Sequence, residues 1–162
     1  KHPLEKAILN SHGIFFSISW EEFNEEDIDF YSETLYSIGI KISDSLQMPV
    51  GLIYNVVEGA PIESFIDRKT LEWHPTLINV LYEWRNTDNT KDHLEVYEPS
   101  YQYQCGIKPL GSFQINSVIW FESNSDSDTD LYSVKKSALI ESWRKVWGDF
   151  FFKKVNINKD ED

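Results

Sequence analysis

The sequence predicts an α/β fold built on a parallel sheet that is covered by helices on both faces. Two short apolar runs, 50–57 and 115–121, show little of the alternation of a half-exposed strand, which is typical of strands buried on both faces. A third strand is expected at 150–157, and segments with helical periodicity separate the three. Strands that alternate with helices form βαβ units, whose parallel strands lie beneath the crossover helices.

The first third of the chain adds a strand and a long helix to this pattern. Within residues 1–13 we expect a short helix at Leu4–Leu9, whereas larger apolar side chains alternate with smaller ones over 14–20, which predicts a strand. Asn24 can cap a helix over 25–46, because its first turn carries three acids and apolar residues then recur every three or four positions.

The remaining elements follow in order along the chain. Gly59 supplies a turn, Pro61 suits the first position of a helix, and helical patterning continues over 62–66 and 75–84. Residues 86–92 and 123–130 are polar loops, and 93–113 is expected to be a long ordered surface loop. A helix over 131–147 ends at Gly148. Residues 1–162 are expected to form a single domain with a frayed acidic tail at 158–162.

Composition excludes several classes of function. The formal net charge is −12, and a polyanion repels phosphate backbones and anionic lipid, so we expect no nucleic-acid partner. No apolar run approaches the length of a membrane span. The lone Cys105 excludes an internal disulfide and favours a small buried hydrophobe over a nucleophile. Because the sequence starts with Lys1 and not Met, we expect a processed, truncated or excised chain.

In parallel sheets, ligands bind beyond the carboxyl ends of the strands. Two places meet this condition, the loop after Val57 and the loop after Phe121. At the second place an apolar run ends abruptly in Glu122, Ser123 and Asn124. A buried strand that ends in an acid, a hydroxyl and an amide is typical of a strand that delivers side chains to a site.

Other short patterns resemble functional motifs, but their settings favour structural roles. Ser43–Leu46 resembles a Gly-Asp-Ser-Leu hydrolase signature, yet it ends a helix where that signature follows a strand. His74 precedes a proline that suits a helix start, which favours a capping or surface histidine, and His93 lies among loop acids. Neither a phosphate-binding loop nor a dinucleotide fingerprint is present, so no cofactor is predicted.

The acidic and aromatic clusters also favour structural roles. The acids at 126, 128 and 130 alternate like a calcium loop but lack its glycine and distal glutamate, so a solvated loop is favoured and no metal is predicted. Most tryptophans lie at core positions, either in a strand or at helical spacing, and Trp73 is the one whose role as a sugar platform stays open.

Four segments together resemble the sialate O-acetylesterases, which are carbohydrate esterases of the SGNH type. Residues 50–67 are similar to a family segment of the form Val-Gly-Leu-Ile-x-Asn-x-x-Gly-Gly-x-Pro-Ile-Glu-x-Trp-Ile-Asp. Residues 97–110 resemble a central loop, 118–124 resemble Val-Ile-Trp-Tyr-Gln-Gly-Glu-Ser-Asn, and 141–147 resemble the following helix. The resemblance runs in order from 20 to 157 and implies a three-layer α/β/α fold that lacks the family's first and last elements.

The resemblance implies hydrolysis of an acetyl ester on a sialic-acid-like sugar by a serine, a histidine and often an aspartate. It further implies a secreted or periplasmic protein. Gly59, Glu122, Ser123 and Asn124 match the segments that hold the oxyanion and the acyl group in the family.

The chain departs from the family pattern at the positions that carry the chemistry. Neither the upstream nucleophile motif nor the downstream Asp-x-x-His motif is found, so no catalytic residue is assigned. Glu58 replaces one glycine of a Gly-Gly pair, and an anion there disfavours a developing oxyanion. The Gln-Gly pair before Glu122 is also absent, which removes roughly 7 Å of chain. An intact active site tolerates far less displacement.

Three interpretations remain open from the sequence. The first is the central segment of a carbohydrate O-acetylesterase that is inactive as this chain. The second is a non-catalytic relative that still binds a glycan or packs in an assembly. The third is a structural α/β domain without a ligand site. The oligomeric state, the sugar and the acetyl position are left open.

Overall fold

A computed structural model describes residues 4–8, 21–22, 33–57, 59–86, 95–123 and 130–157. The chain divides into two compact units, residues 1–58 and 59–162, and each is described by itself. Parallel strand pairs and several helices occur in the described ranges, which confirms the α/β class. The single domain and the three-layer architecture stay predictions. The strand expected at 14–20 and the tail at 158–162 lie outside the described residues.

The first unit contains a small mixed sheet in the order β2-β1-β3. Strand β1 (Leu4–Ile8) pairs in parallel with β3 (Val50–Tyr54) along its whole length, and β2 (Glu21–Glu22) pairs antiparallel with β1. The predicted helix at Leu4–Leu9 is therefore wrong. Pairing with a strand more than forty residues away determines the conformation of this short segment, because local propensity is a weak preference that tertiary contacts override.

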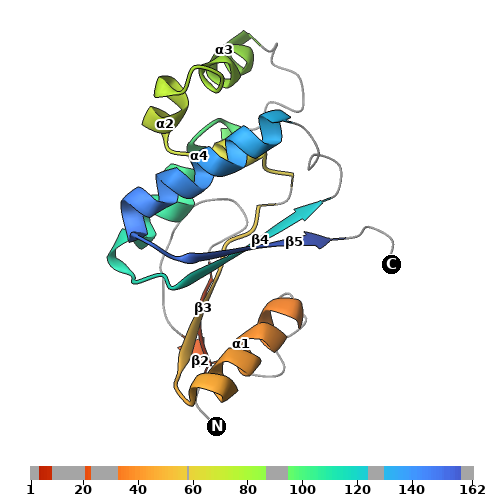
Figure 1. Ribbon diagram of the computed structural model, residues 1–162, viewed down its shortest axis with the longest axis vertical. Coiled ribbons are helices and arrows are strands. Elements are labelled where there is room, and N and C mark those ends of the chain that lie inside the picture. The colour runs from red at the N-terminus through yellow and green to blue at the C-terminus, as the bar shows by residue number, and fades with distance from the viewer. Residues whose placement is uncertain are drawn as a thin grey trace. The chain divides into compact units, whose positions relative to one another are not determined.

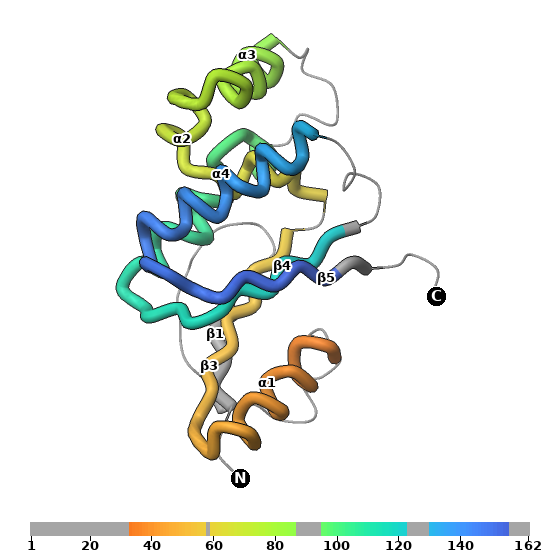
Figure 2. Tube along the Cα trace, viewed as in Figure 1, coloured from red at the N-terminus to blue at the C-terminus, as the bar shows by residue number. Residues whose placement is uncertain are grey.

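Helix α1 (Glu33–Leu46) confirms the second part of the helix predicted over 25–46, while 25–32 lie outside the described residues. Figure 2 shows α1 beside β3 in this unit. A Cβ atom at buried Gly39 would lie 2.7 Å from Cδ1 of Leu52, so a larger residue there would require the Leu52 side chain to shift. Strand β3 confirms the predicted strand but is half-buried, because its only described neighbour is β1 on one side.

The second unit is built on a βαβ element that the sequence predicts closely. Strands β4 (Ser117–Ser123) and β5 (Phe151–Ile157) pair in parallel, and helix α4 (Asp130–Trp147) connects them. Figure 1 shows α4 crossing one face of the pair. The helix ends at Gly148, which has a φ of +73° and donates its N–H to the carbonyl of Arg144 at 2.9 Å.

A row of aromatic rings joins α4 to the sheet. Successive T-shaped contacts with centroid separations of 5.4 to 6.1 Å link five rings in the order Phe65, Trp120, Trp143, Trp147 and Phe150. The indole of Trp143 also donates to the carbonyl of Phe65 at 2.8 Å. Trp143 and Phe65 are buried, whereas Trp120 and Trp147 are partly exposed. The predicted core role is confirmed for Trp143 and holds only in part for Trp120 and Trp147.

Three short helices follow Gly59: two of them confirm the helical patterning predicted over 62–66 and 75–84, and the one between them was not predicted. They are the 3₁₀ helix η2 (Ile62–Phe65), α2 (Arg68–Trp73) and α3 (Ile78–Asn86). Asp67 caps α2 by accepting the N–H of Thr70 at 3.3 Å. His74 accepts the N–H groups of Thr76 and Leu77 through Nδ1 at 3.2 and 3.4 Å, so the predicted capping role of this histidine is confirmed.

Residues 95–113 do not form the predicted surface loop. They fold into the 3₁₀ helix η3 (Glu95–Tyr97), the π-helix η4 (Tyr103–Ile107) and the 3₁₀ helix η5 (Lys108–Ser112). Tyr103, Ile107 and Leu110 are buried. Their spacing of four and three is helical, and this periodicity was hidden by the prolines and glycines around it. Residues 93 and 94 lie outside the described ranges.

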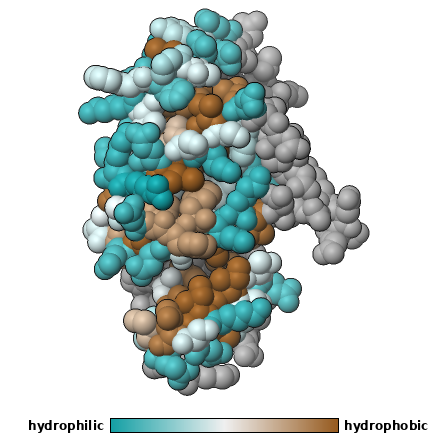
Figure 3. Space-filling view, viewed as in Figure 1, coloured by the Kyte–Doolittle hydropathy of each residue, from teal (hydrophilic) through white to brown (hydrophobic). Residues whose placement is uncertain are grey.

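Apolar surface is distributed over both units. The face seen in Figure 3 shows apolar areas bordered by polar residues. Among the large hydrophobic side chains of the described residues, Trp73 is the most exposed at 85%, and the other exposed ones are Leu46, Met48, Val56, Tyr82, Leu131 and Phe151. In the described ranges, no helix combines the length and the apolar character that crossing a membrane requires.

Candidate functional site

Gly59 occupies a backbone position that other residues adopt only with strain. Its φ is +73°, and a Cβ atom there would lie 2.9 Å from the hydroxyl oxygen of Tyr97. The turn after β3 therefore passes directly against the side chain of η3. This confirms the turn predicted at Gly59, whereas the neighbouring Glu58 lies outside the described residues.

The segment after Gly59 is fixed by contacts with two other parts of the second unit. Glu63 accepts the backbone N–H of Ser100 through its carbonyl at 3.0 Å. Its carboxylate pairs with Nζ of Lys135 on α4, also at 3.0 Å, with side-chain exposures of 16% and 18%. Within the segment, the Ser64 hydroxyl donates to the carbonyl of Pro61 at 2.7 Å. The turn predicted to face an oxyanion thus rests on α4 and on the 95–102 segment.

Glu122 lies inside strand β4, not in the loop beyond it. Trp120, two residues earlier, faces Trp143 of α4, and side chains two apart on a strand share a face. Lys154 pairs in register with Trp120 and therefore lies on the same face. Its Nζ approaches Oε2 of Glu122 to 2.8 Å, and the exposures of the two side chains are 26% and 7%.

Tyr132 completes this cluster from the first turn of α4. The ammonium nitrogen of Lys154 lies 5.5 Å from the centroid of the Tyr132 ring, within range of a cation–π interaction. The sequence interpretation missed Lys154 and Tyr132, because their approach to Glu122 depends on the register of β4 against β5 and on the packing of α4. The available signal was the presence of Lys153 and Lys154 among the apolar residues of the strand predicted at 150–157.

Several buried polar atoms in this unit have no hydrogen-bond partner among the described residues. They include both carboxylate oxygens of Glu122, Oγ of Ser100 and Oε1 of Gln102. Oε2 of Glu122 faces Lys154 as an ion pair, and the amide nitrogen of Gln102 donates to the carbonyl of Val96 at 2.8 Å. Ser100 also has a φ of +71°. Buried polar atoms are normally paired, so these atoms mark the polar interior of the unit as the place to look for a ligand.

The other predicted site residues are described in part or not at all. Ser123 ends β4 opposite Ile157, although its side chain is not described. Asn124 lies outside the described residues, as do two of the three alternating acids, and the third, Asp130, begins α4. The described ranges hold no group of three residues suited to a metal ion. The roles of Gly59, Glu122, Ser123 and Asn124 therefore stay predictions.

The described part of the chain contains no hydrogen bond between a serine and a histidine. The Ser45 hydroxyl donates to the carbonyl of Lys41 at 2.7 Å, and Ser43 donates to the carbonyl of Met48 at 3.0 Å, so the Ser43–Leu46 motif is a helix end, as expected. His74 uses Nδ1 for capping, as described above. The histidines at 2, 12 and 93 lie outside the described ranges.

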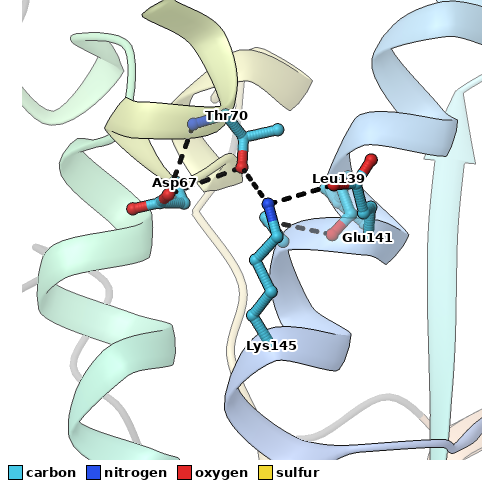
Figure 4. A network of polar contacts seen from close by, with 6 residues as sticks. Asp67, Thr70, Leu139, Glu141 and Lys145 are labelled. Atoms are coloured by element: carbon cyan, nitrogen blue, oxygen red, sulfur yellow. Dashed lines mark hydrogen bonds and ion pairs between the residues drawn. The ribbon is translucent and has the colours of Figure 1, made fainter. Parts of the chain in front are cut away.

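A second polar network connects α2 to α4. Figure 4 shows Asp67, Thr70, Glu141 and Lys145 in this network. The ammonium of Lys145 donates to the hydroxyl of Thr70 at 3.2 Å and pairs with Glu141 at 3.0 Å. Asp67 accepts from the backbone and hydroxyl of Thr70, and burial, followed by the Asp67 charge, raises the pKa of Tyr103. These contacts fix the helix cap and are structural.

Cys105 lies half-buried next to Tyr101. Burial raises the pKa of Tyr101, and the Cys105 thiol and the Glu95 carboxylate raise it further. An upward shift keeps the phenol neutral at physiological pH. The packing of the thiol against a neutral phenol agrees with the expected role of Cys105 as a small apolar side chain.

Replacing Gly59 with alanine is expected to destabilise the second unit by about 2 kcal/mol. A left-handed alanine costs about 1 kcal/mol, and the contact with Tyr97 adds to this. Gly148→Ala is the matched control, because Gly148 has the same φ of +73° but nothing within 4 Å of its Cβ position. Urea unfolding of both variants measures the difference. Equal losses would show that Tyr97 does not press on the Gly59 turn.

No protein-family model matches this chain. The chain is similar to sialate O-acetylesterases, at 28% identity for the protein of Pongo abelii and 27% for that of Homo sapiens, each over 139 residues and 80% of this chain. The Mus musculus protein is 26% identical over 73% of this chain. The chain spans about a quarter of the length of these relatives, 25 to 26%. It is thus a partial match to the sialate O-acetylesterase family.

Proposed function

We propose, on the premise of this partial match, that the chain is the central segment of a carbohydrate O-acetylesterase domain of the SGNH type. In this proposal the segment binds an acetylated, sialic-acid-like sugar beyond the carboxyl ends of its strands. The observation that carries the proposal is the similarity over 80% of the chain to proteins named sialate O-acetylesterase. The α/β architecture of the described residues is compatible with it.

The elements that match the family segments are the ones that position the candidate site. The turn at Gly59 is fixed against Tyr97 and anchored through Glu63, and β4 carries Glu122 and Ser123 to the carboxyl edge of the second sheet. Both belong to the second unit and contact the same helix, α4, through Lys135 and Trp143. We therefore assign sugar recognition to this unit.

We further propose that the chain by itself does not hydrolyse the ester. Acyl transfer by a serine needs a base within hydrogen-bond reach of the hydroxyl. Several serine hydroxyls of the described residues donate to backbone carbonyls and not to a base, namely those at 43, 45, 64, 137 and 142. This observation favours a binding role without catalysis over an active enzyme.

The expected result of an assay is no release of acetate from an O-acetylated sialic acid above the rate in buffer. The chain is purified, and acetate is measured at neutral pH with a full-length sialate O-acetylesterase as the positive control. Turnover that disappears in Ser123→Ala or Ser45→Ala would contradict the absence of a catalytic serine.

Binding is tested separately by tryptophan fluorescence during titration with sialylated and O-acetylated sugars. Trp120 and Trp143 lie close to the Glu122 cluster in the sheet and helix, so occupation of this site is expected to change their emission. A response to the sugars without hydrolysis supports the binding role. No response to any of them would favour a structural domain.

A further inference from the structure

Lys154 lies in the middle of β5, and its ammonium reaches Glu122 near the carboxyl end of β4, in the unit whose ligand is proposed to be an anionic sugar. Its ammonium contacts Glu122 at 2.8 Å and the Tyr132 ring at 5.5 Å, and 26% of its side chain stays exposed. These contacts come from two different elements, β4 and α4. They restrict a side chain that would otherwise lose considerable rotamer entropy when it binds a ligand.

We infer that Lys154 determines the specificity of this site by binding the carboxylate of an acidic sugar, and that Glu122 positions it. The inference rests on the proposed function. An ammonium has three N–H donors, and the Tyr132 ring attracts its charge without accepting a lone-pair hydrogen bond. Glu122 Oε2 forms an ion pair with the ammonium but no hydrogen bond, so the donors of Lys154 remain for a ligand that reaches its exposed part.

The charge of the surroundings makes Lys154 necessary for such a ligand. The chain has a formal net charge of −12, and Glu122 would present an uncompensated carboxylate without Lys154. The ammonium of Lys135, on α4, is engaged with Glu63 at 3.0 Å. Lys154 therefore cancels the repulsion by Glu122 and supplies the attraction, whereas a neutral sugar would need neither effect.

The experiment compares sialic acid methyl glycoside with its carboxyl methyl ester, which keeps the sugar and removes the charge. Affinities are measured by tryptophan fluorescence on the 162-residue chain and on four variants, Lys154→Met, Lys154→Arg, Glu122→Gln and Lys153→Met. Lys153 is the matched control, because it is an exposed neighbour on the opposite face of β5 and its removal changes the net charge equally.

Lys154→Met is expected to lower the affinity for the free acid roughly tenfold, the order expected for one charge-assisted hydrogen bond, and to leave the affinity for the ester unchanged. Glu122→Gln is expected to raise the affinity for the acid, because the amide oxygen still faces Lys154 and positions it while the repelling charge is removed. Lys154→Arg is expected to retain the preference for the acid. Lys153→Met is expected to behave like the unmodified chain.

Several results would overturn the inference. Equal binding of acid and ester by the unmodified chain would refute the role of Lys154 while leaving the proposed function in place. Equal losses for both ligands in Lys154→Met and Glu122→Gln would show a structural ion pair only. If the single variants fail to fold, as judged by circular dichroism, the Glu122→Gln/Lys154→Met pair is used, and it must bind both ligands equally. Failure of every protein to bind either sugar refutes the proposed function, and the inference with it.

Discussion

Trp143→Ala is expected to cost about 3–5 kcal/mol of unfolding free energy, the range for deleting a large buried aromatic side chain. Trp143 is 4% exposed, lies between the rings of Trp120 and Trp147, and donates its indole N–H to the carbonyl of Phe65. The substitution therefore leaves a cavity and an unpaired carbonyl together. Because small domains are stable by about 5–15 kcal/mol, this loss removes a large part of the stability of the second unit and lowers its urea midpoint strongly.

Trp73→Ala is the control for this substitution, because the same residue type is 85% exposed there. Its cost is expected to stay within about 0.5 kcal/mol, as for most surface changes. Urea unfolding followed by circular dichroism compares the two variants without relying on tryptophan emission. Similar costs for both would contradict the placement of α4 against the β4–β5 pair.

Lys135→Met is expected to cost roughly 3 kcal/mol, because it leaves the carboxylate of Glu63 largely buried without its counter-charge. The double variant Glu63→Gln/Lys135→Met removes both charges and is expected to recover part of this loss. The turn after Gly59 should loosen in the single variant, since Glu63 is its link to α4. The backbone N–H of Ser100 donates to the carbonyl of Glu63, so faster hydrogen exchange at this amide reports the loosening.

Arg68→Met provides the comparison for Lys135→Met. Arg68 pairs with Glu72 at 2.8 Å, but the side chains are 32% and 44% exposed, and such pairs contribute at most about 1 kcal/mol. A loss at Arg68 as large as that at Lys135 would mean that burial does not distinguish the two pairs.

The elements that the sequence predicts well are those whose signal is local and repeated. Turn-forming or polar residues mark the ends of the helix before Gly148 and of the strands around Trp120 and Phe152. Within these elements the hydrophobic pattern is regular. The strand at Leu4–Ile8 was missed because its conformation depends on pairing with a distant strand. The short helices around Tyr103 were missed because prolines and glycines interrupt the periodicity there.

The candidate site was predictable in the same uneven way. Gly59 and Glu122 stand out, because a glycine at a turn and an acid at the end of an apolar run are visible in sequence. Lys154 and Lys135 do not, because their partners are 32 and 72 residues away and are set by strand register and helix packing. The sequence thus indicated where the chain approaches a site but not which charges are neutralised there.

The contacts of α4 also constrain how the length of this chain can change. From this one helix, Tyr132 contacts β5, Lys135 and Trp143 contact η2, and Lys145 contacts α2. Successive residues of an α-helix are rotated by about 100°. One residue inserted within α4 would therefore rotate all side chains on one side of the insertion away from their partners. Insertions or deletions between β4 and α4 leave the phase of the helix intact. Variation in length should therefore accumulate at that junction, whereas the number of residues within α4 stays constant.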